Sequence, residues 1–418
     1  MTSPTPPSSR WAHQLQAMRA FLSTHNGVLE MATGSGKTRT ALNIINQLSN
    51  EGLIEVVIVS AFGTDLLDQW YGELLKQTNL RIYRAYAQHR ESLAFINDLN
   101  NSVLLISLDN LDKVLTKLDE AKLAQGLLVC DEVHRLGSTA LVKKLAGRLI
   151  NFRYRLGLSA TPDRTYDQVG NEFIQKEIGP TIFRFGLREA IERGVLCEMD
   201  YIELRYFLSP LDRADVRAII RSHYAKIKSG QAEPIETLYR NISRVRKLTK
   251  EKIQPFREFV SKHPDILKRC IIFVETAEYG ALVQKVLMEY SADYHTYYQD
   301  DDRKNLQLFA EGSLKCLVTC HRISEGIDIH SVNNIVLFSS SRARLETIQR
   351  LGRCLRTDPN NPLKKARVID FIEPSLSEEE NQEDGYLNVD EERREWFLSL
   401  AQIKTSDLAS DSLQVKAV

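Results

Sequence analysis

The stretch GVLEMATGSGKTRTALNIINQL, residues 27–48, constrains the fold more than any other part of the sequence. It begins with an apolar run suited to a buried strand, which TGSG cannot continue. Apolar side chains then recur at helical spacing, at Ala41, Ile44, Ile45 and Leu48. The pattern predicts a strand, a loop and a helix, in which glycine-rich backbone closes around phosphate at a helix N-terminus.

The loop supplies the candidate phosphate-binding residues, which are Thr33, Gly34, Ser35, Gly36, Lys37 and Thr38. In such a loop the lysine places a point charge on the outer phosphates and the threonine hydroxyl ligates Mg²⁺. An earlier glycine of the usual pattern is replaced by Met31, although the TGSGKT core is intact. The alternative is an ordinary glycine-rich turn.

A second candidate element is GLLVCDEVHRLG, residues 126–137. Its apolar run predicts a buried strand that ends in Asp131 and Glu132, at the edge where ligands bind in open parallel sheets. Asp131 would hold Mg²⁺ through a water molecule, Glu132 would polarise an attacking water, and His134 would sense the γ-phosphate or relay its loss. The alternative is a helix N-cap with solvated acids.

The stretch YRLGLSATPDR, residues 154–164, follows with a third apolar strand. It ends in Ser159 and Thr161, whose hydroxyls can bridge neighbouring loops, and Pro162 stops the strand. A plain Ser/Thr turn is the alternative, and the order after DEVH argues against it.

Composition limits the class of protein without indicating a function. A chain of 418 residues, 43% of them hydrophobic, can form two or three globular domains. The six scattered cysteines favour reduced thiols and a cytoplasmic protein, and we expect neither a signal peptide nor a membrane span. Lys plus Arg and Asp plus Glu are equal at 55 each, so any surface for nucleic acid must be local.

MATGSGKT, DEVH and SATP resemble motifs I, II and III of the superfamily 2 helicases and translocases. GPTIFRFGLREAIERGVLCEMDYIEL, residues 179–204, resembles the closing segment of the first lobe in XPB-like translocases and restriction-enzyme motor subunits. The resemblance implies a second lobe, where SEGIDI and QRLGRCLR resemble motifs V and VI. It makes Arg353 and Arg356 the arginine fingers on the γ-phosphate, and Gln349 and Arg350 coupling residues. Gly326 would allow close backbone approach and Asp328 would meet the ribose or the fingers.

The three arginines at positions 350, 353 and 356 also lie three apart, so on a helix they would fall near one face. The alternative for this segment is a solvated basic helix face.

Outside these motifs, Gln14 resembles the adenine-recognition residue, since its amide offers both a donor and an acceptor. Trp11 or His13 could stack on the base, whereas a helix that simply packs inward is the alternative. VLLISLDNL resembles a segment that contacts the nucleic-acid backbone, through Ser107 and Asn110. Side chains that only satisfy a turn are an equal alternative.

The expected fold is α/β, with two tandem RecA-like P-loop domains, each on a parallel sheet, a helical connector and a short C-terminal tail. The predicted segments are 1–9 (disordered tail), 10–203 (first lobe, ATP-binding), 204–255 (connector), 256–373 (second lobe) and 374–418 (acidic and helical tail). We expect the connector to pack on the second lobe, with nucleic-acid contact as the alternative. For the tail we expect a solvated terminal helix, with docking or autoinhibition as the alternative.

The resemblance implies an ATP- and Mg²⁺-dependent helicase or translocase, and the short tail favours DNA over RNA. Two other functions stay open: an RNA helicase, and a nucleic-acid-stimulated clamp or sensor subunit that does not unwind. A partner nuclease or other complex subunits are possible partners, because the chain shows no nuclease constellation.

Overall fold

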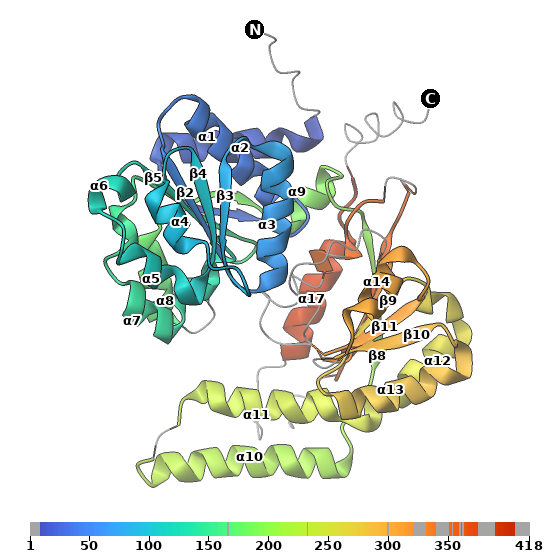
Figure 1. The fold of residues 1–418 in the computed structure, drawn as a ribbon. Coiled ribbons are helices and arrows are strands. Elements are labelled where there is room, and N and C mark those ends of the chain that lie inside the picture. Colours follow the sequence, from blue (N-terminus) through green and yellow to red (C-terminus); the bar gives the residue numbers. More distant parts are fainter. Residues whose placement is uncertain are drawn as a thin grey trace. The chain divides into compact units, whose positions relative to one another are not determined.

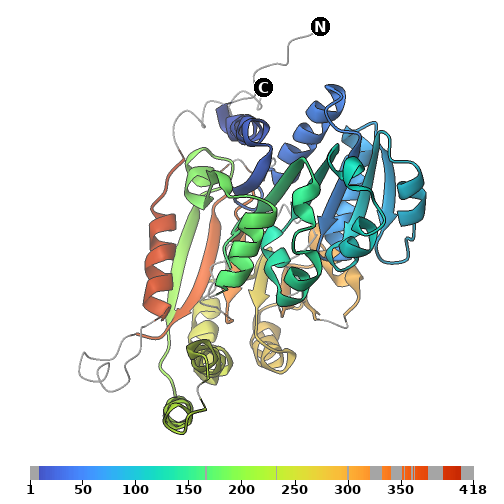
Figure 2. The same cartoon turned by 90° about the vertical axis from the view of Figure 1, so that its left-hand side faces the viewer.

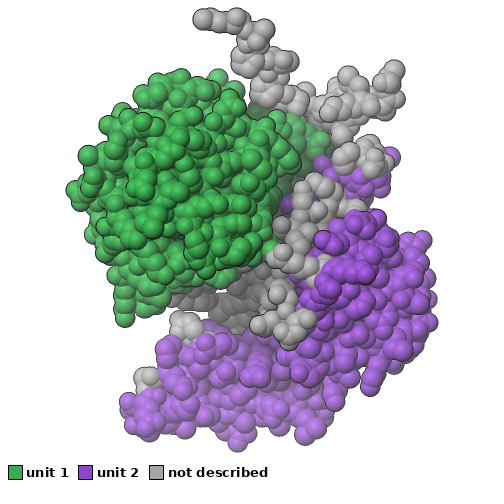
Figure 3. All heavy atoms as spheres, in the orientation of Figure 1, with its two compact units in different colours: residues 1–196, 325–328, 405–418 green, residues 197–324, 329–404 purple. Residues whose placement is uncertain are grey.

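The computed structural model of the protein describes residues 9–164, 167–231, 233–298, 301–320, 332–339, 351–352, 354–358, 361, 363–374 and 389–405. The chain divides into two compact units, coloured separately in Figure 3. Unit 1 extends to Leu196 and unit 2 begins at Cys197, a few residues before the predicted lobe boundary at residue 203.

Unit 1 is an α/β lobe (Figure 1). Its strands are β1 (Asn26–Met31), β2 (Val56–Ala61), β3 (Arg81–Ala85), β4 (Ser102–Ser107), β5 (Gly126–Asp131), β6 (Tyr154–Ser159) and β7 (Thr181–Phe185). Its helices are α1 (Ala12–Thr24), α2 (Lys37–Asn50), α3 (Thr64–Gln77), α4 (Ser92–Asn97), α5 (Leu111–Leu115), α6 (Glu120–Leu123), α7 (Thr139–Leu145), α8 (Gln168–Glu177) and α9 (Leu187–Glu192). The strands form one parallel sheet in the order β3-β4-β2-β5-β6-β1-β7.

The apolar composition of the strands explains why this sheet is parallel and covered by helices on both faces. β2 and β5 are buried at every residue, as strands are when helices pack on both faces of a sheet. The predicted apolar face of α2, from Ala41 to Leu48, is also buried. The strand, loop and helix predicted for residues 27–48 are therefore confirmed.

The strand order places the three predicted motifs side by side. β6 pairs with β1 on one side and with β5 on the other. Because all three strands run in the same direction, the loop after Met31, the carboxylate of Asp131 and the hydroxyl of Ser159 meet at one edge of the sheet. Elements that are far apart in the sequence are thus adjacent in unit 1.

Unit 2 is a second α/β lobe. Its strands are β8 (Met199–Arg205), β9 (Cys270–Phe273), β10 (Tyr294–Tyr297), β11 (Cys316–Thr319), β12 (Asn334–Leu337) and β13 (Ala366–Ile372). Its helices include α10 (Pro210–Lys228), α11 (Ile235–Leu248), α12 (Ile253–Lys262), α13 (Ala277–Tyr290), α14 (Arg303–Glu311) and α17 (Val389–Ala401). The strands form a parallel sheet in the order β10-β11-β9-β12-β13-β8, so the predicted fold of two parallel-sheet lobes is confirmed.

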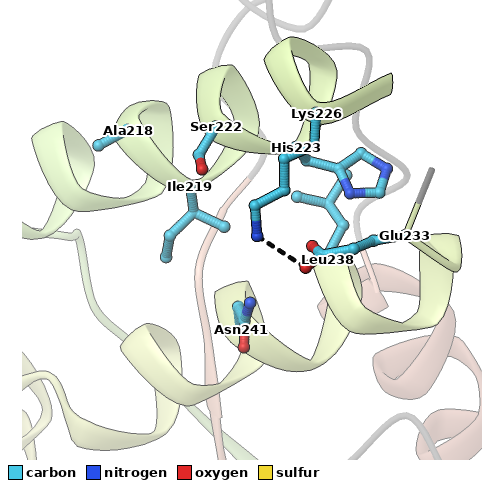
Figure 4. A pocket seen from close by; sticks show the side chains of 8 residues that line it. All are labelled: Ala218, Ile219, Ser222, His223, Lys226, Glu233, Leu238 and Asn241. Carbon is cyan, nitrogen blue, oxygen red and sulfur yellow. Dashed lines mark hydrogen bonds and ion pairs between the residues drawn. The ribbon is translucent and has the colours of Figure 1, made fainter. Parts of the chain in front are cut away.

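Helices α10 and α11 form a hairpin and lie side by side in both views of the ribbon (Figure 2). Ser209 begins α10 with a capping box, in which its side chain and that of Asp212 bond each other's backbone N–H groups. Near the free end of the hairpin, Lys226 Nζ lies 2.6 Å from Glu233 Oε1, beside a cavity of about 230 Å³ (Figure 4). At its base, Arg246 pairs with Glu373 at 2.9 Å, which anchors the hairpin to the second lobe.

Helix α17 corrects the prediction of a solvated terminal helix. Phe397 is fully buried and stacks on Tyr201 of β8, with ring centroids 5.0 Å apart. Arg393 bonds Asp370 at 2.7 Å and Asp390 at 2.9 Å, and both carboxylates are buried. The acidic sequence before the helix suggested solvent exposure, but α17 closes the β8 edge of the second sheet.

Within the described residues, no helix has both the length and the apolar character needed to cross a membrane.

Candidate active site

The loop between β1 and α2 has the backbone that a phosphate cradle requires. Gly34 and Gly36 have φ values of 88° and 91°, a region that side-chain-bearing residues rarely adopt. A methyl group built on Gly36 would overlap Nε2 of Gln14, so the space above the loop is limited as well. Met31, which replaces the earlier glycine, has no positive φ and ends β1, so glycine is not needed there.

The side chains of this loop are placed for an anionic ligand. Lys37 and Thr38 lie in the first turn of α2, where the helix N-terminus carries partial positive charge. Lys37 Nζ donates to the Met31 carbonyl at 3.3 Å, and Ser35 Oγ donates to the Ala32 carbonyl at 2.7 Å. Thr33 Oγ1 is buried and has no hydrogen-bond partner. These features fit the triphosphate of a nucleotide.

Asp131 is the most constrained acid at this edge of the sheet. It is only 3% exposed, and Trp70 of α3 donates its indole N–H to Oδ2 at 2.8 Å. Oδ1 accepts the backbone N–H of Glu132 at 2.9 Å. Burial raises the pKa of Asp131, whereas the charge of Lys37 and the bond from Trp70 lower it. A buried carboxylate beside a phosphate cradle is the type of ligand that Mg²⁺ prefers.

Glu132 is held in a left-handed backbone conformation, with φ 50° and ψ 52°. For a residue with a side chain, this conformation costs on the order of 1–3 kcal/mol, so the surrounding structure must hold it in place. Its Oε2 lies 3.4 Å from Nδ1 of His134. The strained backbone therefore turns the carboxylate of Glu132 toward His134.

His134 connects the second motif to the third. Its Nδ1 lies 3.3 Å from Ser159 Oγ, which also accepts the backbone N–H of Thr161 at 3.1 Å. Burial and the nearby charges of Arg135, Arg164 and Lys37 lower the pKa of His134 to about 3, so the ring is neutral at physiological pH. Thr161 Oγ1 is buried without a hydrogen-bond partner. The structure thus brings the predicted coupling residues of this lobe together.

The predicted adenine-recognition segment also lies beside the loop. Gln14 is buried and its Nε2 donates to the carbonyl of Ser35 at 3.2 Å. His13 is fully buried, stacked on Phe185 with ring centroids 3.9 Å apart, and its Nε2 bonds the same carbonyl at 2.8 Å. The prediction that His13 could stack on a base is therefore wrong, because its ring is stacked on Phe185 and leaves no face exposed. Trp11 is half-buried and stays a candidate.

Ser107 and Asn110 lie at the carboxyl end of β4, and their side chains are hydrogen-bonded to each other. Asn110 Nδ2 donates to Ser107 Oγ at 2.9 Å, and Lys113 Nζ donates to Asn110 Oδ1 at 2.8 Å. These bonds agree with a structured turn. Contact with nucleic acid at these two residues stays a prediction.

Several residues predicted for the second lobe lie outside the described residues, namely Gly326, Asp328, Gln349, Arg350 and Arg353. Arg356 is described and half-buried in unit 2, where burial lowers its pKa to about 10. Its carbonyl accepts the ammonium of Lys364 at 2.8 Å.

Two polar contacts of the site were missed by sequence reasoning. Trp70 falls in register with Leu67 and Leu74, which predicts burial but not a bond to Asp131. Arg164, just beyond SATP, donates to the carbonyl of His134 at 2.8 Å. No sequence signal identifies that backbone acceptor.

A phosphate cradle, a buried Asp131 followed by the partly exposed Glu132, and bridging hydroxyls at adjacent strand ends, in a chain with a second parallel-sheet lobe, define a two-lobed P-loop ATPase. Residues 9–164 match the family model of the type III restriction enzyme res subunit, and residues 251–358 match that of the helicase conserved C-terminal domain. The two models together span more than half of the chain, which belongs to the superfamily 2 helicases and translocases.

Individual relatives agree with this family. The chain is 24% identical over 380 residues to the DNA 3'-5' translocase XPB2 of Sulfurisphaera tokodaii, covering 86% of this chain and 80% of that one. It is 25% identical over 111 residues to the pre-mRNA-processing ATP-dependent RNA helicase PRP5 of Candida glabrata, covering 26% of this chain and 13% of that one.

Among solved structures, the Hef helicase domain of Pyrococcus furiosus matches 90% of this chain and 97% of its own, with a TM-score of 0.53 and 14% identity. At this identity the likeness shows the fold alone.

Proposed function

We propose that the chain is an ATP-dependent DNA translocase or helicase, in which hydrolysis of Mg²⁺-bound ATP drives movement along DNA or strand separation. The observation that carries this proposal is the site on the three adjacent strands β5, β6 and β1, in a chain that matches both helicase family models. The family uses ATP, and the residues present fit that nucleotide.

Each residue of the site has a proposed part. Thr38 and Asp131 would hold Mg²⁺, which supplies positive charge to the β- and γ-phosphates when it is bound. Lys37 adds its charge to the same phosphates, and the backbone N–H groups of residues 33–36 surround them. Glu132 orients the attacking water. His134, whose pKa is lowered mainly by burial, would relay the loss of the γ-phosphate through its contact with Ser159.

The second lobe completes the proposal with residues taken from the family resemblance. Arg353 and Arg356 would stabilise the charge that develops on the γ-phosphate, while Gln349 and Arg350 would couple hydrolysis to movement. Gly326 and Asp328 would approach the nucleotide. The segment boundaries at residues 203, 255 and 373 are part of the same proposal.

One observation favours DNA as the polymer, and a second favours nucleic acid in general. The translocase of Sulfurisphaera tokodaii, which matches most of this chain, is named for DNA, whereas the RNA helicase PRP5 matches about a quarter of it. The α10–α11 hairpin is also strongly basic: residues 209–250 contain ten Lys and Arg against four Asp and Glu, in a chain of zero net charge. An exposed face of α10 carries Arg217, Arg221, Tyr224 and Lys228 at helical spacing.

A local basic surface of this kind suits the phosphate backbone, which a motor must hold without regard to sequence. This observation supports the alternative that the connector contacts nucleic acid as well as packing on the second lobe. It does not separate DNA from RNA, so the RNA helicase and the clamp or sensor subunit are kept as alternatives. Partner subunits, including a nuclease, also stay a prediction.

The deciding experiment measures ATP hydrolysis alone and with single-stranded DNA, duplex DNA, forked DNA and RNA, with Lys37→Ala as the inactive control. Stimulation by one form of DNA is the expected result and identifies the track. Stimulation by RNA alone would favour the RNA helicase. Equal hydrolysis with and without every polymer would refute the motor. A strand-displacement assay then separates a helicase from a clamp that closes without unwinding.

A further inference from the structure

Trp70 makes a contact that packing alone does not require. It lies in the middle of α3 and is fully buried between Leu67 and Leu74 on the same helix face. A buried indole N–H needs an acceptor, and a backbone carbonyl would be sufficient. Trp70 instead donates to Oδ2 of Asp131 at 2.8 Å. The helix that follows β2 is thereby joined to the acid at the end of β5.

The two bonds to Asp131 fix the orientation of its carboxylate. Oδ2 accepts from the Trp70 ring and Oδ1 accepts from the backbone N–H of Glu132. Rotation of the carboxylate about its terminal torsion would break both bonds. Each oxygen keeps a further lone pair for another partner. The carboxylate is therefore held in one orientation with acceptor capacity left over.

The chemistry of the donor matters as much as its position. An arginine or lysine at this place would form an ion pair and cancel the negative charge of Asp131. An indole donates one hydrogen bond, carries no charge and cannot accept a hydrogen bond. It orients the carboxylate and leaves its full charge available to a cation. This is what the environment of a metal ligand has to do.

A second contact joins the same two elements. Phe62, in the loop between β2 and α3, lies under the guanidinium of Arg135, which is 4.6 Å from the ring centroid. Arg135 follows Asp131 in the segment Val133–Gly137, a short 3₁₀ helix. Helix α3 with the loop before it, and β5 with the segment after it, are thus in contact at two points, Trp70–Asp131 and Phe62–Arg135, which limits the freedom of Asp131 further.

We propose that Trp70 is a positioning residue for the magnesium-binding carboxylate: its indole N–H holds Asp131 in the orientation that receives Mg²⁺ with the nucleotide. The inference rests on the proposed function, because Asp131 is the metal ligand of that proposal. It assigns to α3 a part in the ATPase site that its apolar sequence pattern does not indicate.

The test compares Trp70→Phe, which removes the N–H and keeps an aromatic ring, with Leu74→Val, a buried change on the same helix face. Binding of a fluorescent, slowly hydrolysed ATP analogue is titrated with EDTA and with increasing Mg²⁺. Loss of an outer-shell partner of a metal ligand typically lowers metal affinity about 10- to 100-fold. We expect Trp70→Phe to need about 10- to 100-fold more Mg²⁺ for half-maximal enhancement of binding, with metal-free binding within about twofold of the wild type. Leu74→Val should lower thermal stability and leave the Mg²⁺ requirement unchanged.

An unchanged Mg²⁺ requirement in folded Trp70→Phe would overturn the proposal and leave Trp70 a packing residue. If that variant does not fold, the wild-type protein provides the test, because the chain contains only three tryptophans. Their indole N–H signals are observed by NMR after ¹⁵N-tryptophan labelling and assigned with Trp11→Phe and Trp396→Phe. The Trp70 signal should be protected from exchange and should shift when Mg²⁺ is added to the nucleotide complex. A signal that does not respond to Mg²⁺ contradicts the proposal.

These outcomes are separate from failure of the proposed function. Mg²⁺-dependent nucleotide binding needs no nucleic acid, so it can confirm the positioning role even if no polymer stimulates hydrolysis. Conversely, a wild-type protein that is stimulated by DNA, with a Trp70→Phe variant of normal Mg²⁺ requirement, would keep the motor and remove only this inference.

Discussion

Substitution of Gly36 by alanine tests the geometry of the phosphate loop directly. Gly36 ends the loop with φ 91° and ψ 35°, and a methyl group at this position would overlap Nε2 of Gln14. Two costs follow. The alanine must adopt a left-handed conformation, and Gln14 must move away from the carbonyl of Ser35, to which it donates at 3.2 Å.

The size of the effect is the sum of these two costs. A left-handed backbone costs an alanine about 1–2 kcal/mol. The lost hydrogen bond contributes about 1 kcal/mol. If the loop avoids both costs by leaving its phosphate-binding conformation, ATP binding weakens by about 2–3 kcal/mol, which corresponds to roughly 30- to 150-fold.

Gly52 offers a matched control for the backbone cost alone. Its φ is 66°, it lies outside the loop, and a methyl group there would meet no atom within 4 Å. Titration with a fluorescent ATP analogue and thermal unfolding should show that Gly52→Ala loses about 1–2 kcal/mol of stability and no nucleotide affinity. Gly36→Ala should lose nucleotide affinity.

The double variant Gln14→Ala with Gly36→Ala separates the steric cost from the backbone cost. Because the shortened side chain at position 14 removes the overlap, the two substitutions should combine to less than the sum of their separate effects by about 1 kcal/mol. Strictly additive effects would refute the steric argument. Normal ATP affinity in Gly36→Ala alone would refute the whole interpretation of the loop.

Three further predictions concern the hairpin, His134 and α17. The first variant replaces three exposed basic residues of α10, Arg217, Arg221 and Lys228, with glutamine. It should bind nucleic acid more weakly, and the slope of log affinity against log salt concentration should fall in magnitude by about 2–3. ATP hydrolysis without polymer should be unchanged. The control makes the same charge change at three exposed basic residues of unit 1, Lys143, Lys144 and Arg148. An equal effect on binding there would contradict a specific role of the hairpin. His134, with its pKa lowered to about 3, should show no protonation step between pH 5 and 8 by NMR. Since the histidine of the unfolded chain takes up a proton near pH 6.5, the stability that neutral His134 contributes should be complete above that pH and decline as the pH falls toward 3. If NMR instead shows His134 titrating near pH 6.5, its ring is not buried. Arg393→Met leaves Asp370 and Asp390 buried without their shared cation, so urea unfolding should show a loss of about 3–5 kcal/mol, whereas Arg394→Met, at partly exposed ion pairs, should lose at most about 1 kcal/mol. Equal losses in the two arginine variants would contradict the burial argument.

The sequence predicts those parts of the site that depend on local pattern. A strand, a glycine-rich loop and a helix are set within residues 27–48, and an apolar run that ends in Asp131 predicts a buried strand with its acids at the carboxyl edge. Parallel pairing then brings these ends together, because parallel strands place their carboxyl ends on the same side. The motif order and the fold class follow from such local signals.

The side-chain partners could not be predicted, since they depend on tertiary packing. A histidine at position 13 gives the same sequence signal whether its ring stacks on a base or on Phe185. Only the packing of α1 against β7 decides between the two. The tail is similar. Its acidic composition suggests solvent, but two contacts, of Phe397 with Tyr201 and of Arg393 with Asp370, depend on strands of the second sheet that the sequence pattern does not identify.

Trp70 shows how a position that looks purely structural can act on the chemistry. Its spacing with Leu67 and Leu74 is what any buried helix face displays, and the apolar pattern is satisfied whether or not the indole meets a carboxylate. The loop before α3 begins at the carboxyl end of β2, and β2 is the strand next to β5. A helix that starts at this edge must return along the sheet, so one of its buried residues passes close to the end of β5. The functional contact is therefore a consequence of strand order combined with the one aromatic side chain that offers a neutral donor at that place.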